Sequence, residues 1–148
     1  MLSNKAKYGL KAMLYLAEHR KSPKPIGILE IAQDQNIPKK FLDAILLELR
    51  RAGIVHSRKG RGGGYALAKP AEEISVGRII RVLDGPLAPI ACASKTAYRP
   101  CADCDVPNCQ TRRTMQRVRD AMSDILDRMS LAEMLTLPEP VERAFEPW

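Results

Sequence analysis

The sequence predicts a mainly helical protein with one small β-hairpin, and three observations carry that prediction. Apolar residues make up 45% of the 148 residues, enough for a packed core. They recur at helical spacing in several separate stretches. One glycine-rich basic segment lies between two short stretches typical of strands. No stretch approaches the roughly 18 apolar residues that cross a membrane, so we expect a cytoplasmic protein without a membrane partner.

The N-terminal part of the chain predicts two helices. Ser3 suits a helix N-cap, and apolar residues then recur at helical spacing to about His19. The prolines of residues 21–25 break this helix. A shorter helix follows over residues 28–35, and residues 36–38 form a turn.

The next stretch predicts a third helix followed by the hairpin. Pro38 suits the first position of this helix, which runs to about Ala52. Residues 54–58 and 65–68 are typical of two strands, joined by a glycine-rich basic tip over residues 59–64. The buried stripe of the helix consists of apolar side chains at helical spacing, which are Phe41, Leu42, Ile45, Leu46 and Leu49.

The C-terminal half predicts a capped helix, a loop and a long helix. Ser75 caps the first of these, which ends at Gly85 and Pro86. Residues 86–109 form an irregular loop that contains four prolines and every cysteine. A long helix follows over residues 110–129, and its apolar residues form a heptad seam: Met115, Val118, Met122, Ile125 and Met129.

Charge is unevenly spread along the chain. Residues 1–70 carry 14 Lys and Arg against 5 Asp and Glu, whereas residues 71–148 carry 10 against 12. A basic N-terminal part on a mildly acidic remainder favours a polyanionic partner, although a solvated basic surface would look the same.

Two helices, a turn, a third helix and a basic hairpin are the pattern of a winged helix-turn-helix domain. In such a domain the third helix enters the major groove of DNA, where each base pair shows a distinct set of donors and acceptors. The hairpin glycines allow the backbone to approach DNA closely. We therefore expect double-stranded DNA to contact residues of the third helix and the hairpin tip: Lys39, Lys40, Arg58, Lys59, Arg61 and Gly62.

The four cysteines are the second chemical feature. Cys92, Cys101, Cys104 and Cys109 fall within 18 residues, and in a reducing compartment such a cluster favours metal or redox chemistry over structural disulfides. Four thiolates suit a two-iron or four-iron cluster, or tetrahedral zinc. Free thiols in a mobile loop are the alternative without a cofactor. A thiol oxidoreductase is a remote alternative, because the Cys-x-x-Cys lacks a thioredoxin-like context.

The chain resembles the Rrf-two family of bacterial winged-helix regulators, whose members include IscR, NsrR, RirA and CymR. The hairpin stretch with Gly-Gly-Tyr is the most specific match, and the resemblance covers about residues 1–135. The matching stretches are Lys7–Ala17, Glu30–Ala32, Phe41–Leu42, Leu49–Val55, Arg58–Tyr65 and Ile79–Pro86.

This resemblance implies a homodimer, held by the long C-terminal helix, that binds a palindromic operator. Family members with clusters use three cysteines of this loop and a variable fourth ligand, and Cys92 lies where the first is expected. The later spacing departs from the even pattern of the best-known members. The stretch from Asp84 to Pro89 is closer to the cysteine-metabolism branch, which can work without a cluster.

The sequence thus predicts a transcription regulator, a repressor and not an enzyme, with a long C-terminal dimerisation helix. Residues 1–70 would bind DNA, residues 71–135 would form the cysteine-bearing sensor loop and dimerisation helix, and residues 136–148 would be a flexible tail. An iron–sulfur cluster on the loop cysteines would sense iron, redox state or nitric oxide. The alternative is a cluster-free or zinc-binding regulator of cysteine or sulfur metabolism, controlled by a metabolite, thiol oxidation or a partner protein.

Overall fold

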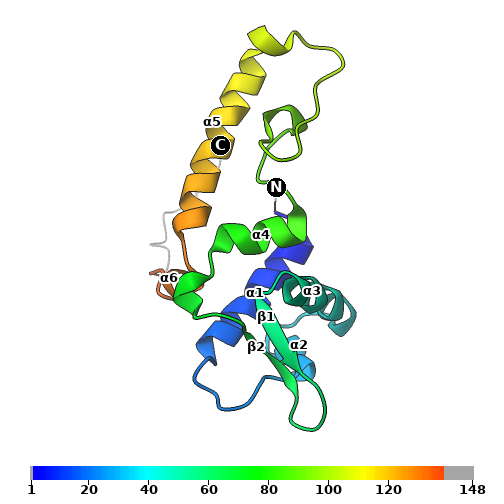
Figure 1. The fold of residues 1–148 in the computed structure, drawn as a ribbon, viewed down its shortest axis with the longest axis vertical. Helices are drawn as coiled ribbons and strands as arrows, with labels where there is room; N and C mark the ends of the chain where they lie inside the picture. The colour runs from blue at the N-terminus through cyan, green and yellow to red at the C-terminus, as the bar shows by residue number, and fades with distance from the viewer. Residues whose placement is uncertain (1, 139–148) are drawn as a thin grey trace, which may run out of the picture.

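The computed structural model describes residues 2–138, and its mainly helical fold with one hairpin confirms the predicted class (Figure 1). The predicted tail lies, from residue 139 on, outside the described residues. In chain order the helices and strands are α1 (Asn4–Glu18), α2 (Ile28–Asp34), α3 (Lys39–Arg51), β1 (Val55–Arg58), β2 (Gly64–Leu67), α4 (Val76–Asp84), α5 (Gln110–Arg128) and α6 (Leu131–Leu135).

Capping residues define most of the helix starts. The hydroxyls of Ser3 and Ser75 accept hydrogen bonds from the first turns of α1 and α4, as predicted. Pro38 caps α3 instead of occupying its first turn. The short α6 was not predicted, although Ser130 and Glu133 form a capping box whose Ser-x-x-Glu pattern is visible in the sequence.

One hydrophobic core connects all the helices. α5 contributes through partly buried side chains near its C-terminal end. The core contains residues from both sides of Pro70, and the domain boundary at that residue stays a prediction. Five large side chains at 0% exposure come from five different helices: Met13, Ile31, Leu46, Ile79 and Leu131.

The first turn of α3 differs from the prediction at Phe41. Its ring is 58% exposed, so its place in the buried stripe was wrong. Phe41 precedes a core residue by one position, which turns it about 100° away from the buried face. The ring lies beside that of Tyr8 of α1 instead, with the ring centroids 6.5 Å apart. The other stripe residues are buried as expected: Leu42, Ile45, Leu46 and Leu49.

The hairpin is anchored to the segment that precedes α2. β1 and β2 pair antiparallel, with Val55 opposite Leu67. Ile26 adds a bridge to this sheet: the Tyr65 N–H donates to the Ile26 carbonyl at 2.8 Å, and the Ile26 N–H donates back at 2.9 Å. The base of the hairpin is therefore held at two places. It continues directly from α3 along the chain, and it is hydrogen-bonded to the segment that leads into α2.

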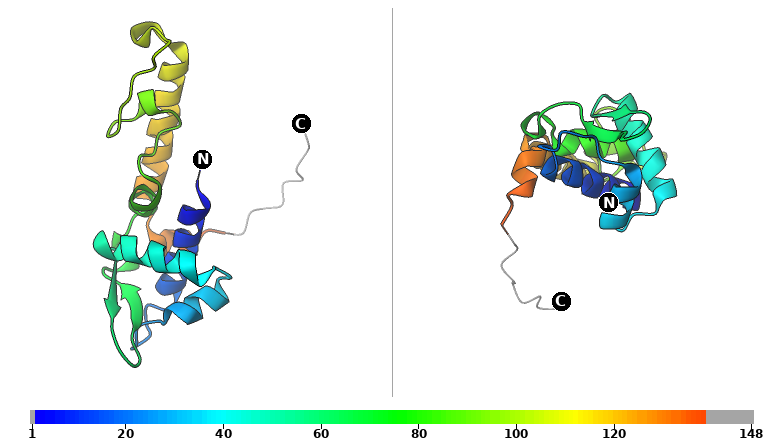
Figure 2. Two further views of the ribbon diagram at one scale, coloured as in Figure 1. Left: turned by 90° about the vertical axis from the view of Figure 1, so that its right-hand side faces the viewer. Right: turned by 90° about the horizontal axis from the view of Figure 1, so that it is seen from below.

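α5 extends away from the core, and the cysteine segment (residues 86–109) runs alongside it (Figures 1 and 2). The hairpin and the cysteine segment consequently lie at opposite ends of the molecule. Two 3-10 helices, Ala91–Ala93 and Val106–Asn108, interrupt this otherwise irregular segment. Among the described residues, no helix is both long and apolar enough to cross a bilayer.

We predict that Gly64→Ala destabilises the fold. An added Cβ would overlap the Ile26 carbonyl oxygen, and this backbone atom cannot turn aside as a side chain could. The loss in the free energy of unfolding should be about 2–4 kcal/mol. Gly27→Ala, where no atom lies within 4 Å of the added Cβ, is the matched control and should cost less than about 1 kcal/mol. Urea denaturation measures both, and equal losses would contradict the prediction.

Candidate DNA interface and cysteine cluster

The turn between α2 and α3 fixes the orientation of α3. Asn36 adopts a left-handed conformation, with φ of 50°, which asparagine tolerates better than most residues. Ile37 is buried, and its N–H donates to the carbonyl of Ala32 at 2.9 Å. With the turn held in this way, Lys39 and Lys40 project from the first turn of α3 as exposed side chains.

Lys39 is engaged within its own helix. Its ammonium group lies 2.8 Å from the carboxylate of Asp43, and both side chains are about half exposed. Exposed i,i+4 pairs contribute only a few tenths of a kcal/mol, so a phosphate group can compete for this lysine. The pairing was not predicted, although its i,i+4 spacing is visible in the sequence.

The hairpin tip presents cations and tightly turned backbone. Arg58, Lys59 and Arg61 are exposed, and no salt bridge in residues 2–138 involves them. Gly62 has a φ of 71°, a conformation that side chains disfavour. A Cβ on Gly63 would collide with the Arg58 carbonyl oxygen, so this turn requires glycine for two separate reasons.

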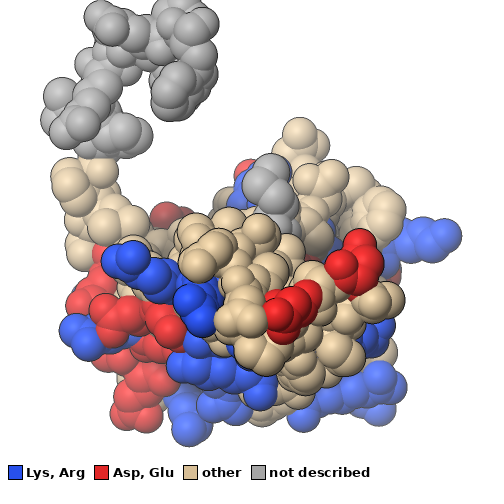
Figure 3. Space-filling model, turned by 90° about the horizontal axis from the view of Figure 1, so that it is seen from above, with Lys and Arg blue, Asp and Glu red and all other residues tan. Residues whose placement is uncertain are grey.

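α3 and the hairpin lie in the half of the molecule that is far from the cysteine segment (Figure 1). Arg50 of α3 donates a hydrogen bond to the hydroxyl of Ser57 in β1 at 3.1 Å, which ties the end of α3 to the hairpin base. The opposite end of the molecule shows acidic and basic side chains next to each other around an uncharged area (Figure 3). The elements that carry the predicted DNA-contacting residues therefore lie away from that mixed surface.

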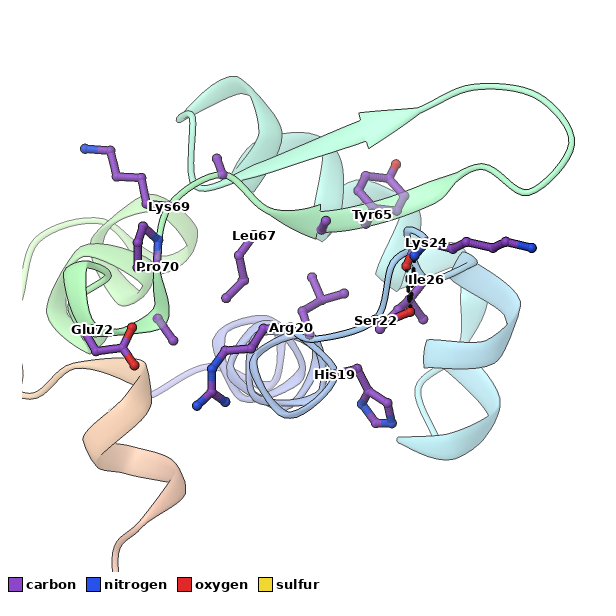
Figure 4. Close-up of a pocket in the computed structure, with 14 residues that line it drawn as sticks. His19, Arg20, Ser22, Lys24, Ile26, Tyr65, Leu67, Lys69, Pro70 and Glu72 are labelled. Carbon is purple, nitrogen blue, oxygen red and sulfur yellow. Dashed lines mark hydrogen bonds between the residues drawn. The ribbon is translucent and has the colours of Figure 1, made fainter.

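A pocket of about 470 Å³ lies between the end of α1 and β2 (Figure 4). Leu16, Ile26 and Leu67 line its apolar part. Lys24 and Lys69 extend away from each other, and neither is directed into the hollow. Ser22 and His19 also line it, but each is engaged with the backbone: the Ser22 hydroxyl donates to the Lys24 carbonyl at 3.0 Å, and Nδ1 of His19 lies 2.8 Å from the Tyr15 carbonyl oxygen.

The cysteine segment brings two of its thiols into contact. Cys92 is buried at 3% exposure in the first 3-10 helix, whereas Cys101 is exposed. Their Sγ atoms lie 3.8 Å apart. At the far end of the segment, Cys109 caps α5 and its sulfur accepts the N–H of Arg112 at 3.4 Å.

Cys101 raises the pKa values of two neighbouring thiols, and it is therefore the central member of the group. The thiol of Cys101, together with partial burial, raises the pKa of Cys104 to about 12. Burial and, secondarily, Cys101 raise the pKa of Cys92. Without a bound cation Cys92 and Cys104 therefore favour the neutral thiol, because adjacent thiolates repel each other.

The fit of these thiols to a metal centre depends on their type and their spacing. In the described part of the chain, no three His, Cys, Asp or Glu side chains are already arranged around one metal position. The donors are nevertheless of the right type for zinc or iron–sulfur centres. Two thiolates at about 2.3 Å from one tetrahedral metal lie about 3.8 Å apart, which matches the Cys92–Cys101 separation. These two residues fit a shared metal atom.

α5 also binds the cysteine segment through residues whose importance the sequence did not reveal. Arg119 is only 9% exposed, and its guanidinium donates to the carbonyl of Ala93. The Nε of Arg112 donates to the Cys92 carbonyl at 2.9 Å. Nothing in the sequence pattern distinguishes Arg119 from the other arginines of this helix, since its acceptor is a backbone atom far along the chain.

The comparisons with known proteins all point to the same family. The chain matches the family model Rrf2, described as an iron-dependent transcriptional regulator, over residues 2–136. An rrf2-like HTH-type transcriptional regulator of Rhodobacter capsulatus is 42% identical over 149 residues, which cover 99% of each chain.

Solved structures agree in both fold and sequence. CymR, the global cysteine regulator of B. subtilis, superposes with a TM-score of 0.75 at 32% identity, over 91% of this chain and 95% of that chain. IscR of T. potens superposes with a TM-score of 0.71 at 33% identity, over 91% and 85%. These relatives are regulators and not enzymes, which removes the thiol oxidoreductase alternative. The chain belongs to the Rrf2 (Rrf-two) family of transcriptional regulators.

Proposed function

We propose that this regulator is a repressor that binds a palindromic DNA operator as a homodimer, in the cytoplasm. The observation that carries the DNA-binding part is the set of exposed cations on the hairpin tip, none of which is neutralised by an ion pair within residues 2–138. Lys39 and Lys40, on the first turn of α3, would reach base edges or flanking phosphates in the major groove. Arg58, Lys59 and Arg61 would contact phosphates or a narrow minor groove.

The glycines of the hairpin support this proposal in a different way. Gly62 and Gly63 leave the turn without side chains next to the cationic positions, so the backbone itself can approach the phosphates. The Gly63 N–H already donates to the Gly60 carbonyl at 3.0 Å, so the N–H of Gly62 is the donor that would face the DNA. Gly62 would be part of the contact surface for this reason.

Replacing hairpin cations tests the DNA interface. Lys59→Ala and Arg61→Ala should each weaken operator binding several-fold. Each should also reduce the slope of log affinity against log salt by about 1 for every phosphate that the variant no longer neutralises. Fluorescence anisotropy over a salt series measures both quantities. Arg117→Ala removes an exposed cation from α5 and serves as the matched control. Hairpin variants that bind like the control at every salt concentration would contradict this interface.

The exposed seam of α5 supports the dimer. Val118 and Ile125 are 40% and 60% exposed, although both are large apolar residues on one side of a helix. Met129, the last seam residue, packs partly against the core of its own chain. The remaining seam repeats at alternating spacings of three and four residues, which suits the same helix of a second copy.

Ile125→Lys should convert the dimer into a monomer. A lysine ammonium group in the centre of an apolar seam loses its hydration without gaining a partner. Sedimentation velocity of the full chain would measure the change, with Arg117→Ala as the control that lies off the seam. A variant that stays dimeric would place the dimer contact elsewhere.

We further propose that the cysteine segment holds an iron–sulfur cluster through Cys92, Cys101, Cys104 and Cys109. The description of the family as iron-dependent and the contact between two of the four thiols support this. A cluster would supply sensitivity to iron supply, redox state or nitric oxide. The 3.8 Å Cys92–Cys101 separation is compatible with two thiolates on one iron, as in a two-iron cluster.

Anaerobic reconstitution with iron and sulfide tests the cluster. The protein should become coloured and bind iron and sulfide in equal amounts, and Cys92→Ala should lose most of this uptake. Visible absorption and metal analysis provide the measurement. A protein that stays colourless and retains only zinc without oxygen would rule out the cluster.

A zinc-binding or cofactor-free regulator of cysteine or sulfur metabolism is the second candidate. The same Cys92–Cys101 separation equals that of two thiolates on tetrahedral zinc. The likeness to CymR, a cysteine regulator in B. subtilis, points in the same direction. A metabolite, thiol oxidation or a partner protein would then supply the signal. Zinc retained under reconstitution conditions would favour this candidate.

A further inference from the structure

Leu87, near the start of the cysteine segment, packs against the hydrophobic core, and beyond it the segment has one buried point of contact with α5. Within the segment, Cys92, Ala93 and Ser94 are the buried residues, at 3%, 0% and 8% exposure. The 3-10 helix that contains the first two packs against α5. The Cys92 thiol is thus fixed in place, while Cys101 lies at the surface.

Two arginines of α5 bind the backbone at this point. Arg112 donates from Nε to the carbonyl of Cys92 at 2.9 Å, and Arg119 donates to the carbonyl of Ala93. The two arginines are seven residues apart, which places them two turns apart on the same side of the helix. They therefore bind consecutive carbonyls at the end of a 3-10 helix, where carbonyl groups lack partners within the helix.

The charge of the buried arginine is balanced within the same contact. Arg119 donates to the Asp120 carboxylate at 2.7 and 2.9 Å, and that carboxylate also lies 3.0 Å from the ammonium group of Lys95. Lys95 and Arg119 together lower the pKa of Asp120, so it is ionised at neutral pH. Lys95 belongs to the cysteine segment, and this pair adds a third attachment.

Arg112 connects both ends of the cysteine cluster. Its side chain binds the carbonyl of Cys92, its backbone N–H binds the sulfur of Cys109, and its guanidinium lies 5.7 Å from the centre of the Tyr98 ring. One residue of α5 thus contacts the first cysteine, the last cysteine and the chain between them.

We propose that Arg112 and Arg119 are positioning residues that hold the Cys92 thiol against α5, so that the other thiols assemble on a fixed first ligand. The consequence for metal binding rests on the proposed function, whereas the holding of Cys92 does not. The two claims can therefore be tested separately.

Alkylation of the reduced, metal-free protein tests the holding. With iodoacetamide and peptide mapping, Cys92 of the wild type should react far more slowly than the exposed Cys101. Arg112→Met and Arg119→Met should each speed alkylation of Cys92 by about tenfold. Each variant loses one charge-assisted hydrogen bond, and this loss shifts the equilibrium between the closed and the locally opened segment by about that factor. Arg117→Met changes the same residue type on the same helix and should leave the rate unchanged.

The direction of the change separates positioning from simple electrostatics. Loss of a nearby positive charge alone disfavours the thiolate and slows alkylation. Acceleration therefore reports release of the segment, and Arg119→Lys should restore part of the protection. Unchanged or slower alkylation in both methionine variants overturns the proposal. Circular dichroism checks that α5 stays helical, and Arg112→Met alone decides the test if the Arg119 variant unfolds.

Cobalt titration then tests the consequence for the metal site. Both methionine variants should bind Co²⁺ about 10- to 100-fold more weakly than the wild type and the Arg117 variant, as is usual for loss of residues that orient a ligand. Equal cobalt affinities overturn the claimed role in assembling the site. If the wild type binds no cobalt, the proposed metal site fails, and the alkylation rates alone support or overturn the holding of Cys92.

Discussion

α4 is packed tightly between α1 and the C-terminal end of α5, and the placement of every functional element depends on this packing. The helices approach closely at two points: a Cβ on Gly9 of α1 would overlap the side chain of Leu83, and a Cβ on Gly77 of α4 would overlap the side chain of Asp127 and lie 3.1 Å from the backbone of Leu126 in α5. Arg81 pairs with Asp127 beside the second contact, at 2.9 Å between Nη2 and Oδ2, and lowers the pKa of that carboxyl. α5 consequently leaves the core in a defined direction.

The same helix connects the two ends of the molecule. Asp84, at the C-terminal end of α4, accepts the backbone N–H of Ser3 at 2.9 Å and leads directly into the cysteine segment. At the other end of α4, the Val76 N–H donates to the carbonyl of Met129, just after α5. Under the proposed function, a rearrangement of the cysteine segment would reach α1 through Asp84 and the proposed dimer seam through α5. A coupling of about 1–3 kcal/mol along such a route would change DNA affinity roughly 5- to 150-fold.

Local signals in the sequence were sufficient for most of the fold. Ser3 and Ser75 cap helices because their hydroxyls bind neighbouring N–H groups, and such short-range chemistry is readable from sequence alone. Phe41 was misplaced because periodicity identifies an apolar face but not which neighbouring element covers its edge. Arg119 was missed because its acceptor, the Ala93 carbonyl, lies 26 residues away and has no side-chain identity to recognise. The cysteines could be grouped by spacing, but the Cys92–Cys101 contact depends on the loop path.

The electrostatics of the cysteine segment suit two states of different charge. Without a cation, the raised pKa values of Cys92 and Cys104 keep those thiols neutral, so the segment needs no counter-charge. Four thiolates around one divalent metal would instead carry a net charge of about −2. The N-terminal end of α5 and the guanidinium of Arg112 lie where they stabilise that charge. The buried residues of the segment, Cys92, Ala93 and Ser94, lie outside the main hydrophobic core, so a change between these states would act first on the contacts between the segment and α5.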